Sequence, residues 1–127
     1  MADRIFLVQG DTKPNLVVSL TDETSAAPIG MDGATVKLYM RAVGGTTILA
    51  TLTGTLLTGK VNTDGSIDTT SPYDIAGSGG RVQFSWGASD LNQTEGDYEG
   101  EIEITFSDAS IQTVYDRLKF KIRADFN

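Results

Sequence analysis

The chain has 127 residues, of which 39% are hydrophobic, and a formal net charge of −7. This length and apolar content are typical of one globular domain, here residues 1–127, built on one core. The acidic balance argues against nucleic acid as a partner, because phosphate-binding surfaces need clustered, unpaired Lys and Arg. Cys and His are both absent, which excludes disulfides, cysteine nucleophiles and the residues that most often bind transition metals. We therefore expect no cofactor.

The N-terminal sequence MADRIFLVQGDTK has one apolar run, Ile5 to Val8, which is too short for the core of a signal peptide. No apolar stretch approaches the roughly 20 residues that a membrane-spanning helix needs. We expect a chain that is made in the cytoplasm and has no membrane partner.

Short runs of alternating apolar and polar residues, separated by turn residues, extend along the chain. This period of two, without a sustained period of 3.6, predicts an all-β fold. The main predicted strands cover residues 5–8, 15–20, 33–40, 48–57, 81–86, 95–106, 111–115 and 118–122. Only residues 88–96 are expected to form a turn of helix.

Glycines predict where the chain turns. Gly44-Gly45 favours a two-residue hairpin turn, since both glycines tolerate a positive φ. Gly54 is expected to break or bulge the strand 48–57. Asp64-Gly65 predicts a type I′ turn within a short hairpin, residues 60–67.

A row of acids occupies alternate positions in TEGDYEGEIEITF, residues 94–106. The positions between them hold Gly, Tyr, Ile and Phe, so one face of this strand belongs to the core and the other faces solvent or an interface. The acids are Glu95, Asp97, Glu99, Glu101 and Glu103.

The next strand supplies complementary charges. A register that sets Ile111 opposite Phe106, followed by a β-bulge at Asp116-Arg117, keeps the later apolar residues on the core face. This register predicts the cross-strand pairs Glu101–Arg117, Glu99–Lys119, Asp97–Lys121 and Glu95–Arg123. Such pairs fix the register and contribute roughly 0.2–1 kcal/mol each. We interpret the row as a structural charge ladder; the alternative, a glycosidase-type carboxylate pair, needs an acid with a raised pKa in a cleft.

Two Gly-containing segments have weaker functional interpretations. GSGGR, residues 77–81, lacks the Lys and the helix of a phosphate-binding loop. We therefore expect the irregular segment 69–80 to be a flexible loop between strands. NTDGSID, residues 62–68, holds Asn62, Asp64 and Asp68 in an order that is faintly like a calcium loop. A hairpin turn explains this segment by itself, and a weak calcium site stays open.

The sequence EGDYEG, residues 95–100, predicts the sheet architecture. Gly-x-Tyr at the start of a penultimate strand resembles the tyrosine corner of Greek-key sandwiches, in which the hydroxyl, here of Tyr98, bonds to upstream backbone. Gly100 stands where antibody domains carry their second Cys, and Trp86 shares a face with other apolar residues, so we place it in the core. These features favour an immunoglobulin-like antiparallel β-sandwich of about seven to nine strands, with Greek-key connections.

The order of segments also resembles a known family. QGDTKPNLVVSLTDE (9–23), DGATVKLYMR (32–41), GDYEGEIEITFSDASIQTV (96–114) and LKFKI (118–122) follow one another as in the N-terminal domain of phage baseplate upper proteins. The resemblance implies a non-enzymatic structural protein of the virion, made in the host bacterial cytoplasm. Its partners would be other virion proteins and copies of itself, with no small-molecule substrate.

This chain departs from the family pattern at Asn127, since such proteins usually continue into a long region that carries the receptor-binding protein. A small tail, baseplate or capsid-decoration protein is therefore an alternative within the same class. Apolar residues near the chain ends and one loop aromatic are the predicted interface residues. They are Ile5, Phe6, Leu7, Tyr73 and Phe126.

Two other functions remain as alternatives. A carbohydrate-binding or adhesion module would use exposed aromatic rings such as Tyr73 or Tyr39, and calcium at residues 62–68. A hydrolase would use the acids of residues 95–103.

Overall fold

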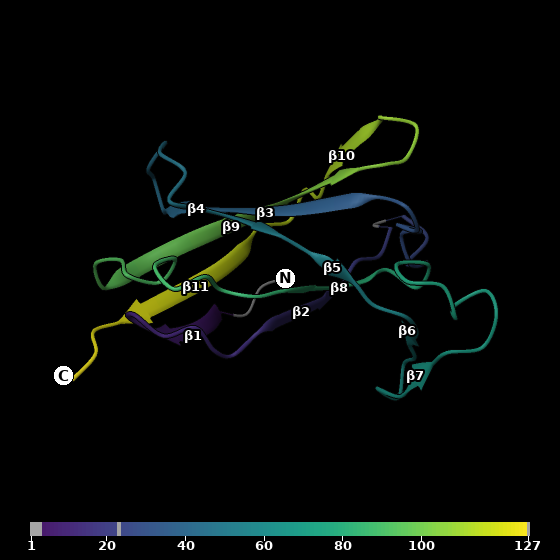
Figure 1. The fold of residues 1–127 in the computed structure, drawn as a ribbon, viewed down its shortest axis with the longest axis horizontal. Helices are drawn as coiled ribbons and strands as arrows, with labels where there is room; N and C mark the ends of the chain where they lie inside the picture. Colours follow the sequence, from purple (N-terminus) through teal and green to yellow (C-terminus); the bar gives the residue numbers. More distant parts are fainter. Residues whose placement is uncertain (1–3, 23, 127) are drawn as a thin grey trace.

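The computed structural model describes residues 4–22 and 24–126, which form strands joined by turns (Figure 1). This confirms the all-β prediction. The strands in the described ranges are β1 (Arg4–Val8), β2 (Leu16–Ser19), β3 (Thr35–Ala42), β4 (Ala50–Thr53), β5 (Thr55–Leu56), β6 (Lys60–Val61), β7 (Ile67–Asp68), β8 (Arg81–Phe84), β9 (Gly96–Thr105), β10 (Ile111–Thr113) and β11 (Leu118–Arg123).

Most strands belong to two sheets. The larger sheet has the order β1-β11-β9-β3-β4, with β10 also paired to β9, and only β1 and β11 run parallel to each other. The smaller sheet has the order β2-β8-β5, and β6 and β7 form a separate hairpin. Figure 1 shows this hairpin at one end of the long axis, while β1, β11 and the C-terminus lie toward the other end.

The inward faces of both sheets share one apolar core, which gives a sandwich-like arrangement. Alternation puts Leu38 of β3 and Ile104 of β9 inward, where they are completely buried together with Phe84 of β8. Trp86 packs edge-on against Phe120 of β11, with ring centroids 5.7 Å apart and an interplanar angle of 82°. The core position predicted for Trp86 is therefore confirmed.

Gly54 allows one segment of chain to serve both sheets. β4, before it, pairs with β3 of the larger sheet, and β5, after it, pairs with β8 of the smaller sheet. A Cβ at Gly54 would overlap Val82 and lie 3.0 Å from Phe84 Cε1. The predicted strand break is confirmed, because only a residue without a side chain can cross so close to the core.

Both predicted two-residue turns are wrong. Met40 pairs with Ala50, so the loop between β3 and β4 is longer, although the chain does turn tightly where the Gly45 amide donates to the Ala42 carbonyl at 2.9 Å. In the second hairpin Gly65 has a φ of 88°, but Asp64 has no positive φ, so the turn is not type I′. In each case one glycine with a positive φ is sufficient, because in a longer loop the neighbouring residue does not need a positive φ.

The expected helical turn at residues 88–96 is also wrong. The Asp90 amide donates to the Gly87 carbonyl and the Asn92 amide to the Ser89 carbonyl, both at 3.2 Å, which gives successive turns instead. Leu91 in this segment is completely buried and anchors it to the core.

Residues 69–80 connect strands without regular structure, as expected, but their glycine-rich end, residues 77–80, is packed between other parts of the chain, whereas most of residues 69–76 are exposed. The Gly77 amide donates to the Leu57 carbonyl at 3.0 Å, and the Gly77 carbonyl accepts from the Met31 amide at 2.9 Å. The Gly80 carbonyl accepts from the Leu20 amide at 2.8 Å. Since three glycines of this segment are buried, the GSGG sequence serves close backbone approach.

Replacing Gly79 by Ala should test this packing. The new Cβ would overlap the Gly59 carbonyl oxygen and lie 2.9 Å from Lys60 Cα, and backbone atoms cannot move aside as a flexible side chain can. We expect the free energy of unfolding to fall by about 3 kcal/mol or more, measured by urea denaturation with Trp86 fluorescence. Gly30→Ala is the control, because its Cβ meets nothing within 4 Å, and it should change stability by less than about 0.5 kcal/mol. Equal stability of the two variants would contradict the close packing of residues 77–80.

Candidate functional site

Charged side chains from four neighbouring strands meet on the outer face of the larger sheet. The register places Arg41 of β3 and Lys119 of β11 on either side of Glu99 in β9, and Arg4 of β1 beside Lys119. Residues directly opposite each other share a face, so these side chains all point away from the core.

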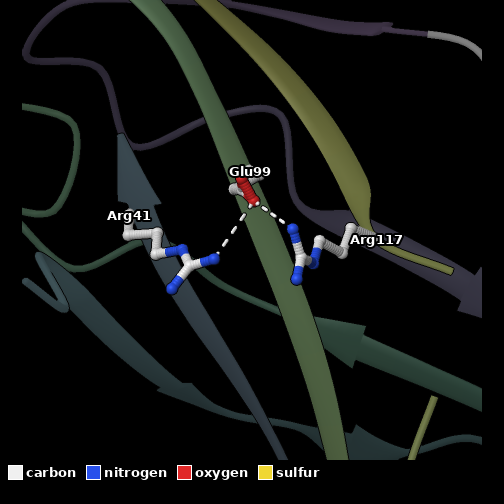
Figure 2. Close-up of polar contacts among 3 residues, drawn as sticks. All are labelled: Arg41, Glu99 and Arg117. Carbon is white, nitrogen blue, oxygen red and sulfur yellow. Dashed lines mark hydrogen bonds and ion pairs between the residues drawn. The ribbon is translucent and has the colours of Figure 1, made fainter. Parts of the chain in front are cut away.

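Glu99 is the centre of this face. Its Oε2 accepts a hydrogen bond from Arg117 Nη1 at 2.9 Å and lies 3.6 Å from Arg41 Nη2. Figure 2 shows the two guanidinium groups reaching the carboxylate from opposite sides. The Glu99 side chain is only 11% exposed, against 51% for Arg117 and 34% for Arg41. A carboxylate so far removed from water needs charged partners, and these two provide them.

Asp97 forms a second, more exposed cluster one step along β9. Its Oδ1 lies 3.6 Å from Arg4 Nη1 and 3.7 Å from Lys121 Nζ. All three side chains are about half exposed, so water and salt screen these pairs and each contributes little to stability.

The predicted charge ladder is confirmed in part. Lys119 lies opposite Glu99 and Lys121 opposite Asp97, as expected. The pair Glu101–Arg117 is wrong, because Arg117 precedes β11 and its guanidinium bonds to Glu99.

The fourth predicted pair, Glu95–Arg123, is not part of the ladder. Glu95 precedes β9, and the paired register ends at Ile122 opposite Gly96. Arg123 Nη1 instead donates to the Ala124 carbonyl at 2.9 Å, and its guanidinium lies 5.3 Å from the centroid of the Phe126 ring.

The predicted register of residues 111–115 is wrong by one residue. Ile111 lies opposite Thr105 and not Phe106, because Ala109 adopts a φ of 71° in a tight turn. Gly100 lies opposite Leu118, so the chain between β10 and β11 accommodates two extra residues where a simple bulge accommodates one. The shift turns Ile111 outward.

Shallow hollows surround Arg117 on this face. One of about 260 Å³ is lined by Tyr39, Arg41 and Ile48 as well as Glu99. Another of about 660 Å³ is lined by Tyr115 and residues on either side of it. The face is therefore uneven, with ion pairs at its centre and apolar side chains toward its rim.

The contact predicted for a tyrosine corner is present. The Tyr98 hydroxyl donates to the Thr94 carbonyl, and the ring is buried. A Cβ at Gly100 would lie 2.8 Å from both Leu38 Cδ1 and Phe120 Cε2, so the small residue at this position lets β9 pack closely on the core.

The predicted interface residues separate into exposed and buried ones. Phe6 is 72% exposed and Phe126 is 96% exposed. Leu7 is 2% exposed and belongs to the core, so its assignment to an interface is wrong; alternation along β1 turns it inward. Ile5 also packs against the core. Tyr73 is partly buried and lies under Lys60, whose Nζ is 5.6 Å from the ring centroid.

The acids of the 62–68 segment make local hydrogen bonds. Asp64 accepts from the Ser66 hydroxyl and amide, and Asp68 accepts from the Thr70 hydroxyl and amide. These bonds lower the pKa of Asp64 and of Asp68. Within residues 4–22 and 24–126, no group of three or more Asp, Glu, His or Cys is placed to hold a metal ion.

Arg41 and Arg4 were missed as members of the site. Alternation along residues 33–40 points Arg41 outward, so its face was predictable, but its partner strand was not. Arg4 reaches Asp97 only because β1 joins the sheet parallel to β11, and local sequence gives no signal for such a pairing.

Comparison of the chain with protein-family models, curated proteins and solved structures gives no match. The described part of the chain contains no helix long and apolar enough to cross a bilayer.

Glu99→Gln should reveal how much the central ion cluster contributes. The neutral amide would leave Arg41 and Arg117 without their shared anion, and we expect a loss of about 1–2 kcal/mol in unfolding free energy. Glu101→Gln changes an exposed acid on the same face of β9 and should cost less than about 0.5 kcal/mol. Urea denaturation of both variants measures the difference, and a larger loss for Glu101→Gln would refute the central position of Glu99.

Proposed function

We propose that the chain is a structural protein of a bacteriophage virion, in the tail, baseplate or another component. It acts through protein–protein contacts in a symmetric assembly and is not an enzyme. Its site of action is the virion, after synthesis in the cytoplasm of the host bacterium.

The strand order supports an immunoglobulin-like module with Greek-key connections. β2, β8 and β5 correspond to strands B, E and D of such sandwiches, and β3, β9 and β11 to strands C, F and G. Tyr98 then lies near the start of strand F, where the tyrosine corner belongs. Modules of this kind are stable scaffolds that present faces and loops to partners.

The observation that carries the proposal is the composition of the outer face of the larger sheet. Large apolar side chains stand exposed around its ion pairs, with exposed fractions from 48% to 85%: Phe6, Val43, Ile48, Ile111 and Tyr115. Exposed apolar groups gathered around Arg side chains are typical of protein–protein interfaces. Asp97, Glu99 and Glu103 of the row lie opposite cations of neighbouring strands, which is the arrangement of a charge ladder.

The carbohydrate-binding alternative finds less support. Trp86 and Tyr98 are buried, and Lys60 lies over Tyr73. A sugar platform needs coplanar exposed rings. Tyr115 is exposed, but no second ring among the described residues is stacked on it.

Mass spectrometry of density-purified particles tests the proposal. Phage released by cells that encode the chain should contain it at a fixed ratio to the major structural proteins, and purified chain should bind particles stripped of it until saturation. Labelled antibody in electron micrographs would place it on the head or the tail. Absence of the chain from purified particles, with binding of glycans, would overturn the proposal in favour of an adhesion module.

A further inference from the structure

Two surfaces at opposite ends of the molecule have opposite charge. The first, which we call the basic edge, is the outward side of β1 and β11. These strands contain four cations and no carboxylate. The cations are Arg4, Lys119, Lys121 and Arg123. Asp97 of the neighbouring β9 pairs with two of them, Arg4 and Lys121.

The second surface, which we call the acidic end, is residues 60–75 with the β6–β7 hairpin. It contains three carboxylates, Asp64, Asp68 and Asp74, and one cation, Lys60. Local hydrogen bonds hold the Asp64 and Asp68 carboxylates, and Lys60 lies over the Tyr73 ring. The acidic end is therefore net negative.

Both surfaces also expose large apolar side chains. Phe6 and Phe126 stand at the basic edge. Val61, Ile67 and Ile75 stand at the acidic end, with exposed fractions from 39% to 56%. Each surface thus combines apolar anchors with charges of one sign, and the two signs are complementary.

The outer face of the larger sheet and the rest of the chain also differ in net charge. On the outer positions of β1, β3, β9 and β11, with Arg117, seven cations face four anions, a net charge of +3. Three further acids flank these strands: Glu95, Asp116 and Asp125. When they are counted with the face, its net charge is zero. The remainder of the sequence then carries all of the net charge of −7, and the three carboxylates and one cation of residues 60–75 contribute −2 of it.

We infer that the basic edge of one copy binds the acidic end of a second copy of this chain. The inference rests on the proposed assembly role, since it names the partner that the exposed surfaces fit. β1 is the last strand on its side of the larger sheet, so an edge strand lies at the contact, as in many strand-mediated associations.

The position of the two surfaces determines the kind of assembly. Figure 1 places β1 and β11 toward one end of the long axis and β6–β7 at the other. Contact between different surfaces of identical chains is heterologous, and it produces a ring where the rotation closes and a filament where it does not. A second copy cannot match basic edge to basic edge, because like charges would meet.

Sedimentation of the purified full chain measures the contact. The average mass should rise with protein concentration and fall when salt is raised from about 20 mM to about 500 mM, because surface charges are screened. A chain that stays monomeric at low salt and about 1 mM protein overturns the inference.

Paired variants identify the two surfaces. Phe6→Ser with Lys121→Ser alters the basic edge, and Ile67→Ser with Asp74→Asn alters the acidic end. Each variant alone should associate at least about tenfold more weakly, with unchanged circular dichroism. The matched control is Val17→Ser, an exposed apolar residue of β2 away from both surfaces, and it should associate as the parent does.

Mixing the two variants is the decisive step. Each retains the surface that the other lacks, so an equimolar mixture should form dimers with one chain of each kind and nothing larger. If the acidic-end variant associates as well as the parent while the basic-edge variant does not, the contact is isologous and the inference is wrong. A monomeric chain found in particles overturns only this inference, whereas a self-associating chain absent from particles overturns only the virion proposal.

Discussion

The structure depends on the strict alternation of β9. This strand pairs with β3 along one side and with β11 and β10 along the other, so its two faces decide which side of three other strands is core. Tyr98, Ile102 and Ile104 point inward and are buried, while Asp97, Glu99 and Glu101 point outward. A shift of one residue would bury the acids and expose the apolar residues, which makes the register strongly specified.

Sequence patterns predicted most of what alternation controls. The all-β class, the inward residues of β3 and β9, the positions of Lys119 and Lys121 and the hydroxyl contact of Tyr98 all follow from a period of two and one short motif. The predictions failed where the chain departs from regular strand pairing. Residues 114–117 join β10 to β11 with two extra residues, and the left-handed φ of Ala109 has no signal in an alanine. The partner of Arg117 is set by these departures and that of Arg4 by the parallel pairing of β1 with β11, so the centre of the candidate site was only half predictable.

The close packing of the glycine-rich residues 77–80 was not predicted, for a different reason. Local composition cannot distinguish a glycine that gives freedom from one that allows close approach, since both need the absence of a side chain. Gly77, Gly79 and Gly80 lie against backbone of residues 20, 31 and 59, which are distant in sequence. Only the three-dimensional structure brings these residues together. The β6–β7 hairpin directly precedes this segment in the chain.

A small module with a polar outer face is suited to repeated weak contacts. Ion pairs satisfy the Glu99 carboxylate at the centre of this face, on which Phe6 and Tyr115 are exposed. An interface of a few apolar anchors and screened charges is weak for one pair of copies. In an assembly, however, each copy is held next to its neighbours, and the local concentration raises the occupancy of every contact without any new interaction. Segregating opposite charges to two ends adds direction to such contacts, because the same end cannot bind itself.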